Sequence, residues 1–154
     1  MFTELTLLFH LIILNMEPKQ KGNLTELQCI TSFYELGYHV SIPYGENCRY
    51  DFIADIKNKL IRVQVKTAKD GKNGSFSIPC RSTRVNSTGS VRRTYTSDEI
   101  DYFCTFYDGV CYLIPIDECS STKTLRINKS ENNQNQNVNW AEDYELSTVL
   151  KKIK

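Results

Sequence analysis

The sequence lacks the paired motifs that hold structural zinc. None of its six cysteines forms a C-x-x-C pair, and its two histidines, His10 and His39, are not spaced to complete a metal site. A disulfide framework is not expected for a domain of this size without a signal peptide. We therefore expect six reduced thiols, the state that is typical of a cytoplasmic protein.

Long hydrophobic runs are missing as well. The most apolar stretch, Leu5–Leu14, has ten residues, about half of the roughly 20 that a membrane-spanning helix needs. It has no basic segment before it and no small-residue cleavage site after it, so it does not resemble a signal peptide. We expect no membrane association for this chain.

Met16 follows that stretch and begins a segment, MEPKQKGNLTE, that is typical of the start of a soluble protein. We predict that residues 1–15 are an extension produced by an upstream start codon. The alternative is that they form a short helix docked on the domain or on a partner subunit. The remaining residues, 16–154, are enough for a single domain with a hydrophobic core.

Neither sign of charge is in large excess, since the net charge is +1. The charges are nevertheless segregated along the chain. Residues 57–93 hold ten basic side chains and one acidic one, whereas residues 97–119 hold six acids and no lysine or arginine. A basic segment of this density suits a polyanion such as nucleic acid. The alternative is a solvated loop with scattered charge.

Two short apolar strands lie between Tyr50 and Thr67, in the sequence YDFIADIKNKLIRVQVKT. In the second strand, apolar side chains alternate with polar ones, so that Gln64 and Lys66 point to one face. In the first strand, Asp51 belongs to the more polar of the two faces. An acid, an amide and a lysine on one sheet face are typical of a metal-assisted phosphodiesterase site.

The turn between these strands decides which side chains meet. A two-residue turn at Lys57-Asn58 places Asp51 directly opposite Gln64. A two-residue turn at Asn58-Lys59 instead places Asp51 opposite Lys66, on the same face. Side chains opposed in this way lie roughly 5 Å apart at Cβ. Either even turn gathers these polar groups, whereas a three-residue turn would separate them.

A helix predicted upstream carries an acid in an unusual place. Asn23 and Glu26 have the spacing of a capping box, and Gly37 supplies a C-terminal stop. In such a helix Glu26 leans toward the buried face that holds Ile30 and Phe33. A carboxylate there is costly unless it is paired or coordinates a metal. Glu26 therefore either serves a functional site or simply caps the helix backbone.

The rest of the chain predicts further strands, a loop and a closing helix. We expect strands at residues 38–42, 76–78, 101–107 and 110–116, a polar loop at 120–139 and a helix at 140–153. The Asp108-Gly109 turn between the last two strands is a strong hairpin signal. Residues 80–97 are rich in Ser, Thr, Asn and Arg and predict an extended segment that becomes ordered on a ligand.

This segment, about residues 80–97, is the candidate DNA-binding segment. Its arginines and the basic residues that flank the central strands are the candidates for DNA contacts. They are Arg49, Lys69, Lys72, Arg81, Arg84, Arg92 and Arg93.

A helix with Glu26, a strand with Asp51 and a strand with Gln64-Val65-Lys66, in this order, resemble the core of the PD-(D/E)xK nucleases. The segments KGNLTE, RYDFIAD and RVQVKT are similar to the small group I intron-encoded homing endonucleases of cyanobacterial type. The resemblance covers roughly residues 19–116. It implies an α/β fold with a central mixed β-sheet flanked by helices. Two positions depart from the family pattern. Gln64 stands where the motif has its second carboxylate, and Tyr50 stands where it has a proline.

The resemblance also implies the roles of the site residues. Glu26, Asp51, Gln64 and Lys66 would form the catalytic set. Asp51, the Gln64 side-chain oxygen and the Val65 backbone carbonyl would bind Mg²⁺, with Glu26 assisting and Mn²⁺ as a substitute. The metal would acidify a water that attacks the phosphate, and Lys66 would hold that water and offset charge on the phosphate oxygens. The partners implied are double-stranded DNA and further copies of the chain, as a dimer or tetramer.

Three functions follow from these observations. The first is a site-specific DNA endonuclease of homing type. The second is another nuclease of the same fold, such as a Holliday junction resolvase or a restriction enzyme. The third is a DNA-binding protein that kept the fold without catalysis, an alternative that the neutral Gln64 favours and the presence of Glu26, Asp51 and Lys66 disfavours.

Overall fold

The computed structural model describes residues 11–12, 15–45, 47–128 and 137–153, and only the backbone of residues 84–86. Most of the predicted extension at residues 1–15, and the asparagine-rich part of the predicted loop at 120–139, lie outside these ranges. Among the helices in the described ranges, none has the length and apolar character to cross a membrane.

A five-stranded mixed sheet forms the centre of the molecule, in the order β1-β2-β3-β8-β9. Its neighbours are antiparallel except for β3 and β8, which run parallel. The predicted α/β fold with a mixed sheet is confirmed. The strands are β1 (His39–Ser41), β2 (Phe52–Ile56), β3 (Lys59–Val65), β8 (Tyr102–Tyr107) and β9 (Val110–Pro115).

Helix α2 (Pro18–Glu35) packs across one face of this sheet through Thr25, Cys29 and Phe33, which are buried. The prediction that the helix begins at Asn23 is wrong. It begins at Pro18, and Glu17 and Gln20 form a reciprocal capping box at its start. Glu26 is therefore an interior residue of the helix and does not cap its backbone.

Helix α3 (Leu146–Lys152) packs on the same core, next to β9. The single helix predicted for residues 140–153 is divided in the structure into α3 and a preceding 3₁₀ turn, η2 (Ala141–Tyr144). The break falls at Glu145, whose backbone is extended and forms a β-bridge with Tyr112. Pairing with the sheet thus interrupts a segment whose apolar spacing alone favours a continuous helix.

A second, three-stranded sheet covers the other face of β8 and β9. It contains β4 (Lys69–Asp70), β5 (Ser75–Pro79) and β10 (Thr122–Arg126), in the order β10-β5-β4. The prediction of a polar loop over residues 120–139 is wrong for β10. Its Lys123 is buried because the ammonium group pairs with Glu118 (3.1 Å) and donates a hydrogen bond to the Tyr144 hydroxyl oxygen (2.9 Å).

Residues 80–97, predicted to be an extended segment that becomes ordered on a ligand, contain a regular β-hairpin in the structure. Strands β6 (Arg81–Asn86) and β7 (Gly89–Thr94) pair along their whole length and project away from the two sheets. Every residue of β7 is exposed. The tight turn before Gly89, whose φ of 134° suits glycine, connects the two strands.

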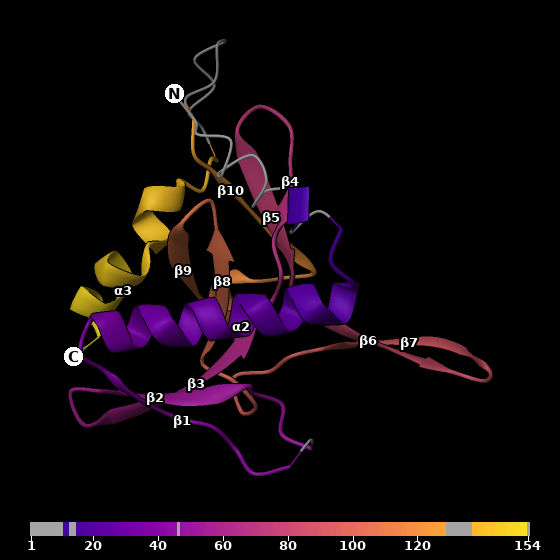
Figure 1. Ribbon diagram of the computed structural model, residues 1–154, viewed down its shortest axis with the longest axis horizontal. Coiled ribbons are helices and arrows are strands. Elements are labelled where there is room, and N and C mark those ends of the chain that lie inside the picture. The colour runs from indigo at the N-terminus through magenta and orange to yellow at the C-terminus, as the bar shows by residue number, and fades with distance from the viewer. Residues whose placement is uncertain (1–10, 13–14, 46, 129–136, 154) are drawn as a thin grey trace.

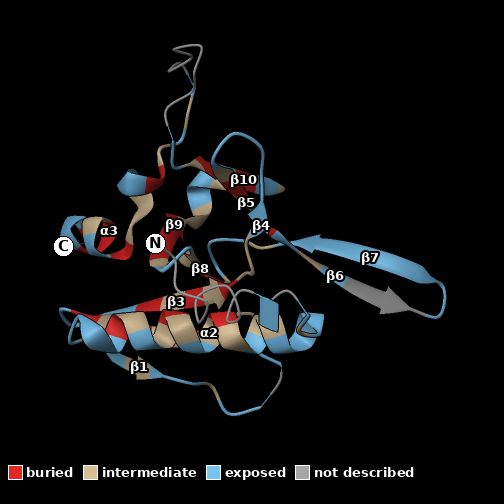
Figure 2. Ribbon diagram, turned by 45° about the horizontal axis from the view of Figure 1, so that its top comes forward, coloured by how far each residue is buried: buried red, intermediate tan, exposed pale blue. Residues whose placement is uncertain are grey.

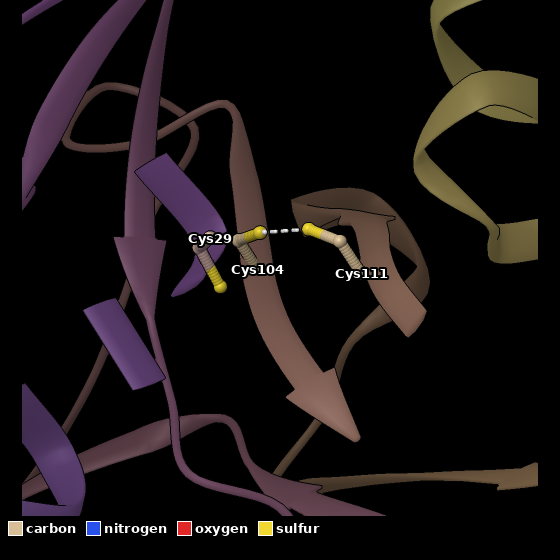
Figure 3. Close-up of side chains that lie close together, drawn as sticks. All are labelled: Cys29, Cys104 and Cys111. Atoms are coloured by element: carbon tan, nitrogen blue, oxygen red, sulfur yellow. Dashed lines mark hydrogen bonds between the residues drawn. The ribbon is translucent and has the colours of Figure 1, made fainter. Parts of the chain in front are cut away.

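Three cysteines meet in the core beneath α2. Cys29 of α2, Cys104 of β8 and Cys111 of β9 are buried, and their sulfur atoms lie within 4.8 Å of one another (Figure 3). A structural zinc site needs four ligands and this cluster offers three. Buried free cysteine behaves as a small apolar residue, so we assign the cluster to the core. All six cysteines are free, as predicted.

Candidate active site

The strands β2 and β3 pair in the first of the two predicted registers. Ile56 lies opposite Lys59, and Lys57 and Asn58 form the two-residue turn with φ values of 53° and 67°. Positive φ at both turn positions matches the right-handed twist of a hairpin. Continued toward the open end, this register sets Asp51 opposite Gln64, as predicted.

The Asp51 carboxylate is held at the end of the sheet by two donors. Its Oδ2 accepts hydrogen bonds from the Val65 backbone N–H (2.6 Å) and from Nε2 of Gln64 (2.5 Å). Burial raises the pKa of Asp51, while these two hydrogen bonds and the nearby Lys66 charge oppose that rise. Asp51 is thus a desolvated acid with polar partners on one side.

The Gln64 side chain connects two oxygen atoms of the predicted metal set. Its Nε2 donates to Asp51 Oδ2 and also to the Val65 carbonyl oxygen, at 3.1 Å. Rotation of the amide group would replace these N–H donors with Oε1, so that three oxygen atoms would face one point. Magnesium and manganese prefer such oxygen ligands. The residues present therefore fit a hard divalent cation.

Glu26 stands within electrostatic reach of this group. Its pKa is raised first by burial and second by the negative charge of Asp51. The carboxylate comes from α2, about two turns after the point where the helix begins. Because Glu26 lies inside the helix, the predicted alternative of a simple backbone cap is excluded. A second acid beside Asp51 is the arrangement that a bound cation would stabilise.

Lys66 follows β3 directly, and its side chain has a partner that sequence reasoning missed. Its backbone N–H donates to the Cys104 carbonyl, which continues the parallel pairing with β8. Its Nζ donates to the Tyr95 hydroxyl oxygen at 3.0 Å and lies 4.8 Å from the centre of the Tyr95 ring. Tyr95 is the single aromatic residue in the segment 80–97, a signal that could have identified it.

Arg49 is fixed by protein groups at the base of the hairpin. Its guanidinium group pairs with Glu99 (3.2 Å) and lies 4.0 Å above the centre of the Tyr95 ring. It also donates to the Ser82 hydroxyl (3.1 Å) and the Thr94 carbonyl (3.2 Å). The contact of Arg49 with DNA stays a prediction, and the structure gives this residue a second, structural role.

The other predicted DNA contacts differ in how their side chains are engaged. Arg81 and Arg92 share one face of the hairpin, since Arg92 lies opposite Thr83. Both are exposed, and within the described residues neither side chain forms a hydrogen bond or ion pair. Arg93 points to the other face and pairs with Glu99. Lys69 and Lys72 are exposed near β4, and the Arg84 side chain lies outside the described part of the structure.

Comparison with known proteins agrees with this geometry. A sequence model of the family described as PD-(D/E)XK endonuclease matches residues 16–147, most of the chain. The chain belongs to the PD-(D/E)XK endonuclease family. Nucleases of this family generally use divalent metal ions. No curated protein sequence matches the chain.

A solved structure is also similar to this PD-(D/E)XK endonuclease. It is that of a bacterial homing endonuclease, I-Ssp6803I, and the two superpose with a TM-score of 0.71. The alignment covers 89% of this chain and 95% of the other, with 24% sequence identity. This likeness confirms the fold. The family match, for its part, supports an endonuclease.

Proposed function

We propose that the chain is a metal-dependent endonuclease that cuts double-stranded DNA at specific sites, as homing endonucleases do. The observation that carries this proposal is the bridge made by the Gln64 amide between the Asp51 carboxylate and the Val65 carbonyl. The charges of Glu26 and Lys66 are close enough to Asp51 to act on it, since Asp51 raises the pKa of Glu26 and Lys66 lowers that of Asp51. In a nuclease family, an oxygen-rich cluster next to a lysine is the constellation that phosphodiester hydrolysis requires.

Each side chain has a role that its position supports. Asp51, Gln64 and the Val65 carbonyl would hold Mg²⁺ or Mn²⁺, with Glu26 as a further oxygen donor. The ion, when bound, would lower the pKa of the attacking water and offset phosphate charge. Lys66, held on the same side of the sheet by Tyr95, would donate hydrogen bonds to that water or to a phosphate oxygen. Because Gln64 is neutral, Asp51 supplies most of the negative charge of the site.

The substrate and assembly follow from the surface and from the chemistry. The exposed Arg81 and Arg92 of the hairpin would contact phosphates of the duplex. Each chain carries one such site, so cutting both strands calls for at least two copies, as a dimer or tetramer. The free thiols and the family function fit a cytoplasmic enzyme. The similarity to a bacterial homing endonuclease favours a homing role over junction resolution or restriction.

Metal removal tests the proposal directly. A plasmid pool with randomised inserts, incubated with the purified protein, should yield discrete double-strand cuts in Mg²⁺ or Mn²⁺ and intact plasmid in EDTA. Sequencing of the ends then gives the target site. If the plasmid stays intact with every metal while the protein still shifts DNA in a gel-shift assay, the result would support the non-catalytic alternative instead.

A four-way junction distinguishes the two nuclease candidates. The junction and a linear duplex carrying the recovered target site are compared at equal concentration, with Mg²⁺ present. We expect cleavage of the linear duplex at the target and no preference for the branch point. Preferential cleavage of the junction, independent of sequence, would assign the protein to the resolvases.

As the pH is lowered, cleavage should be lost at a higher pH than it would be if Asp51 and Glu26 had ordinary carboxylate pKa values. Since the pKa values of Asp51 and Glu26 are both raised, the two acids take up protons above the usual range for aspartate and glutamate. A protonated carboxyl does not bind the cation, so the cleavage rate should fall as pH drops through these raised values. The measurement is the single-turnover rate against pH at a Mg²⁺ concentration below half-saturation, because a cation bound at saturation would itself lower the pKa of its ligands. A rate that holds constant down to the ordinary carboxylate range would contradict it.

A further inference from the structure

Tyr95 connects the site to the hairpin through two kinds of contact. Its hydroxyl accepts a hydrogen bond from Lys66 Nζ, and its ring packs edge-on against Phe103, which lies opposite Gln64 in the sheet. Phe103 is fully buried, so the ring of Tyr95 has a rigid support on this side. The hydroxyl is therefore held at a fixed place above the end of β3.

Arg49 covers the same ring from another direction. Its guanidinium carbon lies 4.0 Å from the ring centre, while its nitrogens bind Ser82 of β6 and the Thr94 carbonyl at the end of β7. Glu99 pairs with Arg49 and with Arg93 of β7. Glu99 also accepts from the Thr96 backbone N–H, which fixes the turn directly after Tyr95. These contacts join both hairpin strands to the segment that carries Tyr95.

A lysine needs such support to act at a defined point. Its ammonium group ends a flexible four-carbon chain and carries three N–H donors. Tyr95 takes one donor of Lys66 and leaves two for a water molecule and a phosphate oxygen. Misplacement of a reacting group by about 1 Å can cost on the order of 100-fold in rate. The position of Lys66 should therefore depend on Tyr95.

We propose that Tyr95 is a positioning residue for Lys66, and that Arg49 and Glu99 make this positioning depend on the base of the DNA-binding hairpin. The proposal rests on the endonuclease function proposed above. Contact of the hairpin with DNA would then act on the geometry of the Lys66 ammonium as well as on affinity. The contacts of Arg49 and Glu99 would then link DNA recognition by the hairpin to cleavage at Lys66.

Tyr95→Phe tests the first part, because it keeps the ring and removes the hydroxyl. The single-turnover rate at saturating protein should fall roughly 10- to 100-fold, the size expected for a hydrogen bond to a charged group. The dissociation constant for the target duplex should stay within about twofold. Tyr107→Phe is the matched control, since its hydroxyl donates to Asp70 (2.8 Å) and its ring stacks on Phe76. That control should cleave as the wild type does.

An NMR measurement makes the test independent of cleavage. The ¹⁵N-labelled ammonium signal of Lys66, assigned by its loss in Lys66→Arg, should shift in Tyr95→Phe and stay in place in Tyr107→Phe. If the wild-type protein does not cut DNA, the endonuclease proposal is refuted. The NMR signal would in that case still report the contact between Lys66 and Tyr95. Wild-type cleavage together with full activity of Tyr95→Phe, or an unmoved Lys66 signal, would overturn the positioning role.

A double-mutant cycle tests the connection to the hairpin. Glu99→Gln removes the charge that pairs with Arg49 and Arg93, without adding a cationic group or touching the site. If Glu99 acts through Tyr95, the rate of Glu99→Gln combined with Tyr95→Phe should equal that of Tyr95→Phe alone. Losses that multiply would show that the two residues act separately and would overturn this part of the proposal.

Discussion

Replacing Asp51 by asparagine should lower the single-turnover rate of DNA cleavage by about 1,000-fold or more. Asparagine has nearly the same shape and still accepts the hydrogen bond from the Val65 N–H, but it removes the negative charge that would hold the cation. With the neutral Gln64 opposite, no second carboxylate on β3 can replace it. Binding of the duplex should persist, because the exposed basic residues of the hairpin are unchanged.

The stability of the same variant separates chemistry from folding. The pKa of Asp51 is raised in the folded protein, so the folded state binds this proton more tightly than the unfolded state. Ionisation therefore costs folding free energy as pH rises through the raised value. Asp51→Asn should melt at the wild-type temperature or above it near neutral pH. Loss of cleavage with a lowered melting temperature would indicate a structural defect instead.

Asp55→Asn is the matched control for this substitution. Asp55 lies on β2, four residues after Asp51 and on the same face, and its side chain accepts the Asn58 N–H of the turn at 3.1 Å. It contacts neither Gln64 nor Val65, so we expect wild-type cleavage from this variant. Equal cleavage by Asp51→Asn and Asp55→Asn would refute the mechanism proposed for the site.

Neutralising Arg81 and Arg92 together should weaken duplex binding roughly 50-fold at about 0.1 M salt. Each phosphate contact releases condensed counterions, which is worth nearly tenfold in affinity at this salt concentration. The plot of log affinity against log salt should become shallower by about 0.9 for each lost contact. Fluorescence anisotropy with the double variant Arg81→Gln, Arg92→Gln at several salt concentrations measures both quantities.

A variant with the same change in charge elsewhere provides the comparison. Lys57 and Lys59 are exposed at the opposite end of the sheet, beside the β2–β3 turn, whereas the hairpin leaves from the other side of the molecule (Figure 1). Lys57→Gln combined with Lys59→Gln should change the affinity by less than about threefold. Equal losses in the two double variants would mean that the duplex responds to net charge alone and does not contact the hairpin face.

The register of the central hairpin can be predicted because it depends on neighbouring residues only. Strict alternation in β3 fixes which side chains are buried, and two residues with positive φ fix the turn. The start of α2 differs from its prediction although the signals there are local too. The capping-box spacing at Asn23 is a valid signal, but Glu17, Pro18 and Gln20 form the earlier start, and glutamate is not among the preferred capping residues.

The features that sequence patterns do not predict depend on contacts between distant parts of the chain. β10 has a polar sequence, and Lys123 is buried in it because Glu118 and Tyr144 compensate its charge. Tyr95 meets Lys66 across 29 residues of sequence, and the pairing of β3 with β8 is what brings them together. Local periodicity carries no information on such partners.

The pairing of Arg81 with Thr94 closes the β6–β7 hairpin at its own base. Both ends of the hairpin therefore leave the body of the protein at one point. The connections of the central sheet do not depend on the length of the hairpin. Such a hairpin can be lengthened, shortened or exchanged without changing the strand order of the central sheet. The boundary of a successful exchange is set by Ser82 and Thr94, which Arg49 binds, and by Tyr95 just beyond them.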